Sequence, residues 1–260
     1  MPMHVFITGA ATGIGEATVE CLHRKYPSAG FTIIDKNQHG LQQACERLTD
    51  RGIRAHGVAA DLTEIDALPD IVRRAREDMG DIELLVNNAG IMLVEDFSQM
   101  SWEKGMLTMN LNLLAPVRLM HTVLPDMLRR GKGGIINIAS MAGKTILPGC
   151  SWYGASKAGL GQISEITGTE IEGSGVHILT VYPGPIDTSL AQGARANLDE
   201  NLAARYMPVG DRYTMAEKIV EAYDKKESVL VYPAIYDAAR HFHTVSSWIA
   251  KRFAPRTRAS

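Results

Sequence analysis

Residues 4–15 of the chain read HVFITGAATGIG, and this stretch decides the fold. Its first four residues have the composition of a short buried strand, and three glycines follow at positions 9, 13 and 15. The helical pattern that comes next carries apolar residues at Ala17, Cys21 and Leu22. In such a stretch the first glycine permits a tight turn, the second lets the backbone approach a pyrophosphate, and the third lets the helix pack closely on the strand. The stretch therefore predicts a phosphate-binding turn between a strand and a helix.

Further strand-like segments follow along the chain, and helical patterns separate them. They cover residues 31–34, 54–60, 84–87, 134–138, 176–182 and 229–232. Alternation at this spacing is typical of a parallel sheet with helices on both faces, joined by right-handed crossovers. We therefore predict a doubly wound α/β sheet with three layers, α/β/α, and the Rossmann strand order 3-2-1-4-5-6-7. In such a sheet, ligands bind beyond the carboxyl ends of the strands.

The stretch Tyr153-Gly154-Ala155-Ser156-Lys157, with Ser140 thirteen residues before it, carries a candidate proton-transfer set. A spacing of four on a helix places Tyr153 and Lys157 on one face, one turn apart. Lowering a tyrosine pKa from about 10 to about 7 takes on the order of 4 kcal/mol, which one ammonium at about 4 Å supplies only in a partly dry site. We therefore expect a covered cleft in which Tyr153 is an acid or base at a carbonyl or carbinol carbon.

Length and composition are typical of one α/β domain spanning residues 1–260, since the chain has 260 residues and 45% hydrophobic content. The three cysteines form no CxxC pair, and the histidines show no HExxH pattern, so we expect neither disulfides nor a metal. The first strand begins at His4 and no apolar run approaches about 18 residues. These features favour a cytoplasmic protein in a reducing compartment.

With these residues placed, the chain resembles the short-chain dehydrogenase/reductase family over roughly residues 3–190. Gly9, Gly13 and Gly15 match the family's glycine turn, and Asp61-Leu62 matches its Asp-aliphatic pair. The family's Asn-Asn-Ala-Gly stretch is present as Asn87-Asn88-Ala89-Gly90. Its Pro-Gly loop is present as Pro183-Gly184-Pro185-Ile186-Asp187-Thr188. The resemblance implies a catalytic set of Asn110, Ser140, Tyr153 and Lys157. It also implies nucleotide contacts from Gly9, Thr12, Gly13, Ile14, Gly15, Asp35, Asp61, Leu62, Asn88, Ala89, Gly90, Tyr153, Lys157, Pro183, Gly184, Ile186 and Thr188.

The chemistry that follows is hydride transfer between a carbinol carbon and a nicotinamide. In the oxidation direction Tyr153 takes the hydroxyl proton, Lys157 holds the phenolate and the cofactor ribose, and Ser140 hydrogen-bonds the substrate oxygen. The resemblance implies that Asn110 holds a water that relays protons from the lysine. A nucleotide-binding regulator without turnover is the alternative of another class, and the filled catalytic set argues against it.

Cofactor choice rests on Asp35, which ends the second strand. A carboxylate there can accept hydrogen bonds from both hydroxyls of the adenosine ribose and would repel a 2′-phosphate, which favours NAD. Lys36 beside it can tolerate a phosphate, whereas Thr12 stands where phosphate-preferring relatives often carry a basic residue. An NADP-dependent carbonyl or 3-oxoacyl reductase is therefore the second candidate.

The expected substrate region is mostly apolar, which favours a lipophilic secondary alcohol or ketone such as a steroid, a terpenoid or a long-chain ketone. We expect a substrate lid over about residues 189–211. The expected substrate contacts are Ser140, Met141, Cys150, Tyr153, Pro185 and Leu190. Arg195 and Arg205 in the lid would favour an acidic substrate, such as a hydroxy acid or an acyl thioester, if either pointed inward.

Residues 238–260 carry a formal charge of +5 with no acid, and apolar residues recur at helical spacing from Ile235 to Phe253. We predict a basic amphipathic helix over about residues 235–254, which packs on a subunit or makes peripheral contact with anionic lipid. The family resemblance implies a homodimer or homotetramer. Nucleic-acid binding is not expected, because the overall charge is −2 and no aromatic-basic motif accompanies the tail.

Overall fold

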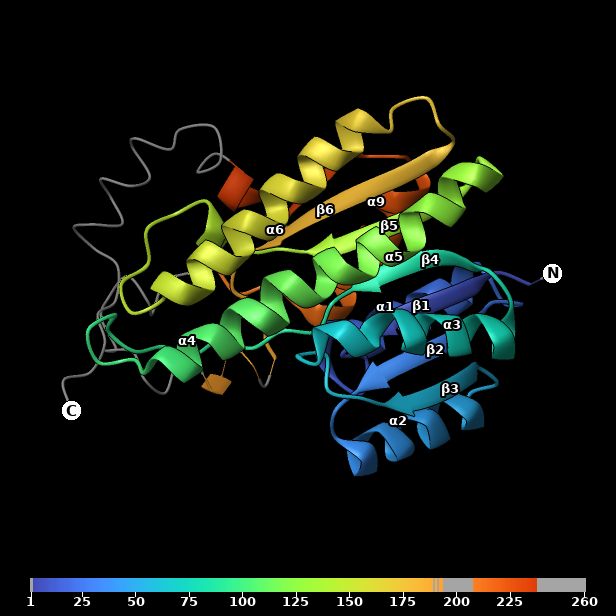
Figure 1. Cartoon of the computed structure of the whole chain (residues 1–260), viewed down its shortest axis with the longest axis horizontal. Helices are drawn as coiled ribbons and strands as arrows, with labels where there is room; N and C mark the ends of the chain where they lie inside the picture. The colour runs from blue at the N-terminus through green and yellow to red at the C-terminus, as the bar shows by residue number, and fades with distance from the viewer. Residues whose placement is uncertain (1, 189, 191, 194–207, 238–260) are drawn as a thin grey trace.

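The structure is a computed structural model that describes residues 2–188, 190, 192–193 and 208–237. Seven parallel strands form one sheet in the order β3-β2-β1-β4-β5-β6-β7, which is the predicted order (Figure 1). The strands are β1 His4–Thr8, β2 Gly30–Asp35, β3 Arg54–Ala59, β4 Ile82–Asn87, β5 Gly133–Ile138, β6 Val176–Pro183 and β7 Val229–Tyr232. The predicted doubly wound α/β fold is therefore confirmed.

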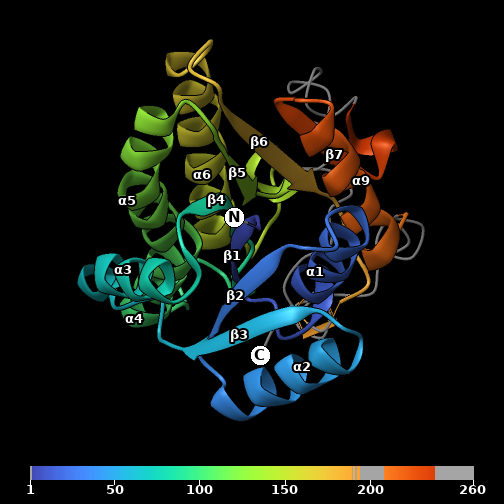
Figure 2. The ribbon, with the colours of Figure 1, turned by 90° about the vertical axis from the view of Figure 1, so that its right-hand side faces the viewer.

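Helices cover both faces of the sheet, as the alternation of segments predicted. Figure 2 shows α3, α5 and α6 on one side of the strands and α1, α2 and α9 on the other. The helices are α1 Gly13–Lys25, α2 Gln38–Asp50, α3 Leu68–Met79, α4 Trp102–Met109, α5 Ala115–Arg130, α6 Ser151–Glu170 and α9 Arg212–Asp224. Short helical segments add η1 Ile65–Ala67, a π-turn η2 Asn110–Leu114, η3 Met141–Gly143 and η4 Ala234–Tyr236.

The core has one apolar layer on each side of the sheet, because successive side chains of a strand point to opposite faces. In β1, Val5 and Ile7 belong to the layer under α1 and α9, whereas Phe6 belongs to the layer under α3 and α5. All three are fully buried. Burial on both faces explains why the strands of this chain read as continuous apolar runs and not as alternating ones.

Two predicted segments fall largely or wholly on residues that the structure does not describe. Of the lid, the structure describes Leu190, residues 192–193 and residues 208–211, so Arg195 and Arg205 lie outside it. The predicted C-terminal helix lies outside it from residue 238 onward. Among the helices that are described, none has both the length and the apolar content that a membrane span requires.

Candidate active site

A cavity of about 830 Å³ follows the carboxyl-terminal edge of the sheet. Gly9 reaches it just after β1, Asp35 at the end of β2, Asn88 after β4, Ser140 after β5 and Pro183 at the end of β6. The parallel topology thus brings together residues that lie far apart in the sequence, at the edge where α/β sheets bind ligands. Every residue that we expected to touch the nucleotide lines this cavity except Gly15.

The glycine turn between β1 and α1 is built for close backbone approach. Gly9 has φ +65°, and a Cβ there would lie 2.7 Å from the Cα of Ala89. A Cβ on Gly15 would lie 2.5 Å from the carbonyl oxygen of Gly9, so Gly15 packs α1 against the turn below the cavity wall. A Cβ on Gly13 would meet only Thr188 Cγ2, at 3.9 Å, and would project into the open cavity. The turn therefore fits a dinucleotide, whose pyrophosphate would lie at the backbone of Gly13 and the N-terminus of α1.

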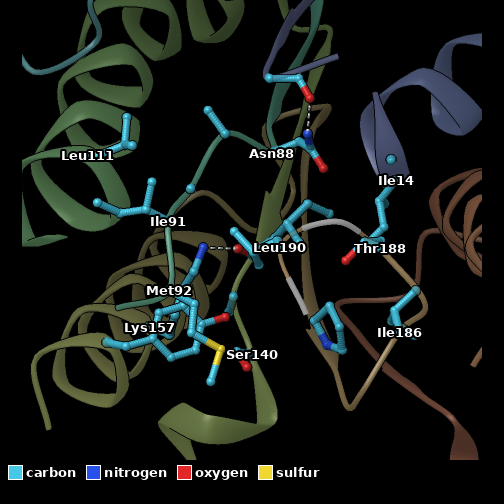
Figure 3. Close-up of a pocket in the computed structure, with 18 of the residues that line it drawn as sticks. Ile14, Asn88, Ile91, Met92, Leu111, Ser140, Lys157, Ile186, Thr188 and Leu190 are labelled. Carbon is cyan, nitrogen blue, oxygen red and sulfur yellow. Dashed lines mark hydrogen bonds between the residues drawn. The ribbon is translucent and has the colours of Figure 1, made fainter. Parts of the chain in front are cut away.

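The Asn-Asn-Ala-Gly stretch after β4 holds this turn in place. The Asn88 side chain donates from Nδ2 to the carbonyl oxygens of Thr8 and Gly9, at 3.0 and 2.7 Å. The Thr8 hydroxyl oxygen accepts from the backbone N–H groups of Asn88 and Ala89, both at 3.1 Å. Asn88 thus lies at the cavity wall, but its amide is occupied in joining β1 to β4 (Figure 3).

The far end of the cavity carries three charged side chains: Asp35, Lys36 and Asp61. The Lys36 ammonium lies 2.6 Å from a carboxylate oxygen of Asp61, and it is the main cause that lowers the pKa of Asp61 to about 2. The backbone N–H of Asn37 donates to the carboxylate of Asp35 at 3.0 Å. At this end the Asp35 carboxylate could bind a ribose, while the Lys36 ammonium is already paired with Asp61. In the described part of the chain, no group of three His, Cys, Asp or Glu side chains could hold a metal.

The proton-transfer residues converge at the other end, where η3 and α6 meet β5. The Ser140 hydroxyl oxygen accepts from the backbone N–H of Ala142 at 3.1 Å. The Lys157 ammonium donates to the carbonyl oxygen of Ile138 at 2.7 Å, and Figure 3 shows this side chain close to Ser140. Tyr153 and Lys157 are 6% and 4% exposed, so the site is the covered cleft that the sequence predicts.

Burial sets the protonation states of this pair. It lowers the pKa of Lys157 to about 8 and raises the pKa of Tyr153, and a hydrogen bond with Ser140 opposes the second effect. We expected the ammonium to bring the tyrosine pKa down toward neutrality. The structure shows the opposite direction, because desolvation of the phenolate outweighs the favourable interactions. The Tyr153 phenol, with its raised pKa, therefore holds its proton at neutral pH.

Asn112 occupies the place that we expected for Asn110. Its side chain accepts from the backbone N–H of Ile91 at 2.9 Å and donates to the carbonyl oxygen of Ile91 at 2.8 Å. A Cβ on Gly90 would lie 3.0 Å from Asn112 Oδ1 and 3.4 Å from Lys157 Nζ, so this amide lies beside the lysine. Asn110 does not line the cavity, and no side-chain hydrogen bond joins it to another described residue.

Helical spacing explains why Asn112, and not Asn110, faces the sheet. Two residues apart on a helix point to nearly opposite sides, so only one of the two asparagines can face the sheet. The buried positions of this helical stretch recur at three- and four-residue intervals, and they include Gly105, Thr108, Asn112, Ala115 and Leu119. Position 112 continues that series and position 110 does not. The π-turn η2 ends in the bond from the Ala115 N–H to the Asn110 carbonyl.

The end of the cavity that carries Ser140 and Tyr153 is lined mainly by apolar side chains, and this is the end where we expect the substrate. Ser140, Met141, Tyr153, Pro185 and Leu190 line it as expected, and in Figure 3 Leu190 lies between the catalytic side and the side that carries Ile14 and Ile186. Cys150 does not line it, because this residue is 2% exposed and packs behind the wall against Val94 and Tyr153. Further lining residues are Ile91, Met92, Leu107, Leu111, Ala142, Thr145, Leu147 and Tyr236. The sequence did not single out Tyr236, because it follows the last strand and matches no motif.

Comparisons with known proteins agree with this geometry. A profile described as short chain dehydrogenase matches residues 3–199. The ketoacyl reductase HetN of Nostoc sp. is 32% identical over 228 residues, which are 87% of this chain and 77% of that protein. A fatty acyl-CoA reductase of Mycobacterium tuberculosis is 33% identical over 197 residues, which are 74% of this chain and 66% of that protein.

Two solved structures have the same fold. A short-chain dehydrogenase from Sphingobium yanoikuyae in complex with NADPH superposes with a TM-score of 0.79 at 28% identity, covering 94% of this chain and 96% of that one. A short-chain dehydrogenase from Streptomyces avermitilis gives a TM-score of 0.80 at 24% identity, covering 96% and 95%. The chain belongs to the short-chain dehydrogenase/reductase family of nicotinamide-dependent oxidoreductases.

Proposed function

We propose that the protein is an NAD(H)-dependent oxidoreductase that transfers hydride between the nicotinamide and a lipophilic secondary alcohol or ketone. One observation carries the proposal: the proton donor Tyr153 opens into a cavity end that carries no charged side chain among the described residues apart from Lys157. Charged lining residues gather instead at the far end, at Asp35, Lys36 and Asp61. An anionic substrate would find no described partner near the reacting carbon, whereas a hydrocarbon chain or ring would be buried among apolar side chains.

The proposed roles follow from the contacts of each residue. The nicotinamide, when bound, supplies or accepts the hydride at the carbinol carbon. The Ala142 N–H occupies one lone pair of the Ser140 oxygen, which leaves the serine proton to donate to the substrate oxygen. In reduction, the Tyr153 hydroxyl proton moves to that oxygen as the carbon accepts hydride, and the phenolate is then reprotonated. Lys157 keeps two N–H donors beyond its bond to Ile138, and we assign them to the phenolate and the cofactor ribose.

We propose Asn112, in place of Asn110, as the residue that organises the proton path beside Lys157. Its side chain is fully buried and is anchored to both backbone groups of Ile91. It therefore fixes the helix around η2 against the loop after β4. The Gly90 backbone in this loop lies close to the Lys157 ammonium. A relay of protons to solvent would begin at that ammonium.

The raised pKa of Tyr153 affects how the rates of reduction and oxidation depend on pH. A group with a raised pKa keeps its proton over more of the pH range, so the donor form is present below that pKa and is lost as pH rises through it. We therefore expect the reduction rate to hold on the alkaline side of neutrality. The oxidation rate, which needs the phenolate, should rise with pH over the same range.

A second candidate is an NADP-dependent 3-oxoacyl or carbonyl reductase. The solved relative from Sphingobium yanoikuyae holds NADPH, two relatives are named as ketoacyl and fatty acyl-CoA reductases, and Lys36 lies at the nucleotide end of the cavity. Against it, the Lys36 ammonium is paired with Asp61, and the carboxylate of Asp35 at the same end of the cavity would repel a 2′-phosphate. We expect at least a tenfold preference for NADH over NADPH in kcat/KM, and Asp35→Ala should narrow it. An NADPH preference in the parent protein would favour the second candidate.

The substrate proposal is tested by a panel of ketones read by NADH absorbance. We expect kcat/KM to rise by about fourfold for each methylene added to a 2-alkanone from five to nine carbons, since one buried methylene contributes about 0.8 kcal/mol. A 3-oxoacyl-coenzyme A, whose phosphates make it anionic, and a ketose phosphate complete the panel. Faster turnover of either anionic compound than of the long ketones would contradict the proposal.

We further propose a homodimer or homotetramer formed through α4, α5 and α6. Exposed apolar side chains on these helices include Leu107, Leu128, Ile163 and Ile166. The glycines of α6 do not contribute, because Gly159 packs on Leu113 and Gly161 on Tyr182 within the subunit. Replacing Ile163 and Ile166 with lysine should shift the elution of the protein to a smaller species.

The proposed domain is the whole chain, with the nucleotide and catalytic residues on one sheet. Cytoplasmic location remains a proposal, and so does lipid contact of the basic residues 238–260. A liposome sedimentation assay with and without the last 23 residues tests the lipid contact.

A further inference from the structure

In residues 232–236, which begin at the last residue of β7, two tyrosine rings pack on two glycines of other segments. A Cβ on Gly210 would lie 2.5 Å from a ring carbon of Tyr232, and a Cβ on Gly184 would lie 2.7 Å from a ring carbon of Tyr236. Real Cβ atoms do not come this close to another carbon, so each ring rests directly on a glycine backbone. The segment therefore touches both the Pro-Gly loop after β6 and the stretch just before α9.

Backbone hydrogen bonds join the same three segments. The Gly184 N–H donates to the Tyr232 carbonyl at 2.8 Å, and the Gly210 N–H donates to the Pro185 carbonyl at 2.8 Å. The Asp187 N–H completes the set by donating to the Gly210 carbonyl at 3.0 Å. The Pro-Gly loop after β6, which lines the cavity, is thus held by two segments that lie far from it in the sequence, residues 208–210 and 232–236.

Tyr236 is the member of this assembly that reaches the cavity. Its ring lines the wall together with Met141 and Pro185, and it packs on the buried cluster formed by Ala139, Met141 and Tyr182. Its hydroxyl donates to the carbonyl oxygen of Pro208 at 3.0 Å. The ring is therefore fixed at both ends, by Gly184 beneath it and by Pro208 at its hydroxyl, and its position does not depend on a bound ligand.

We propose that Tyr236 is a specificity-determining residue, whose ring forms a fixed wall of the substrate end and limits how wide a group the cavity accepts beside the reacting carbon. Tyr236 lies outside the span that matches the family model, residues 3–199. The ring occupies space that a wider group would need, so it leaves room for an extended alkyl chain and sterically excludes a ring or branch at the same place. The proposal rests on the proposed function, because it specifies which ketones that function admits.

The test compares a linear ketone, 2-nonanone, with a ring-bearing ketone of similar size, 4-phenyl-2-butanone. In Tyr236→Ala the ratio of kcat/KM for the ring-bearing ketone to that for the linear ketone should rise at least tenfold over the parent ratio. Tyr236→Leu keeps an apolar side chain and serves as a second variant in case Tyr236→Ala does not fold. It should raise the same kcat/KM ratio about threefold. Tyr236→Phe keeps the ring and removes only the bond to Pro208, so its ratio should stay within about twofold.

Tyr213→Ala is the matched control, because Tyr213 is 42% exposed on α9 and does not line the cavity. Its ratio should equal that of the parent, and the Kd for nucleotide should stay within about twofold in every variant. A ratio that is unchanged in both Tyr236→Ala and Tyr236→Leu overturns the proposal. An equal rise in Tyr213→Ala overturns it as well.

Binding separates this proposal from the proposed function. Calorimetry measures the Kd of each ketone for the protein saturated with oxidised nucleotide, which cannot reduce it. If the parent reduces neither ketone, the proposed function fails, while a changed ratio of the two Kd values in Tyr236→Ala still supports the wall. Equal Kd ratios in the parent and Tyr236→Ala, or no ketone binding at all, overturn it.

Discussion

The two ends of the cavity are built from different materials. At the nucleotide end Gly9 and Gly15 bring backbone segments into close contact, Gly13 leaves the cavity open, and the hydrogen bonds of Asn88 hold the turn. At the substrate end the wall is mainly side chains, which come from loops after β4, β5 and β6 and from the segment after β7. Backbone shape needs particular residues at fixed spacings, whereas an apolar wall accepts many combinations. The first end therefore constrains its sequence more tightly than the second.

The largest expected effect on stability comes from the glycine turn at the nucleotide end. Gly15→Ala should lower the free energy of unfolding by about 3 kcal/mol or more, because the new Cβ would lie 2.5 Å from a backbone oxygen and 2.8 Å from the Cα of Ala10. Gly13→Ala is the matched change in the same turn. It should cost only about 1 kcal/mol for its positive φ, while nucleotide affinity falls at least tenfold. Urea unfolding and nucleotide titration measure the two quantities, and equal losses of stability would contradict the assignment.

The next prediction concerns the lysine at the junction of the two ends. The pKa of Lys157 is about 8 in the folded protein, below the value of about 10.4 in an unfolded chain. Below pH 8 the lysine is protonated in both states, and the burial cost is fully present. Between about pH 8 and 10.4 the unfolded chain binds more protons, so the stability of the parent rises with pH.

Lys157→Met has no titrating group at this position and avoids the cost of burying a charge, so it should be more stable than the parent at neutral pH. That gain in stability should shrink as pH rises. The difference in unfolding free energy between Lys157→Met and the parent should narrow by up to about 3 kcal/mol between pH 7.5 and 10.4. Urea unfolding without nucleotide at several pH values measures it. A difference that stays constant over this range would show that the lysine is not desolvated in the folded state.

The last stability prediction separates the two asparagines. Asn112→Ala leaves both backbone groups of Ile91 without their side-chain partner, so it should cost about 2 kcal/mol and lower kcat at least tenfold. Asn110→Ala should change stability by less than about 0.5 kcal/mol and kcat by less than twofold. The reverse order of effects would restore Asn110 to the catalytic set.

The sequence was sufficient where a single residue type satisfies a backbone requirement. The glycine turn, the strand order and the group Ser140, Tyr153 and Lys157 could all be predicted, because spacing and local chemistry determine them. It was insufficient where two similar residues compete for one buried place, as Asn110 and Asn112 do, and where burial decides between opposing influences on one pKa, as at Tyr153. It also could not indicate Cys150 as buried behind the wall or Tyr236 as part of it, since both depend on how loops pack.

The central claim is that Tyr153 donates and accepts the proton at the substrate end while the nucleotide end works independently of it. The most direct test is Tyr153→Phe, with NADH binding followed by fluorescence and turnover of 2-nonanone followed by absorbance. We expect kcat to fall by at least a thousandfold, because the proton donor is lost, while the Kd for NADH stays within about threefold. Turnover within about tenfold of the parent would contradict the claim.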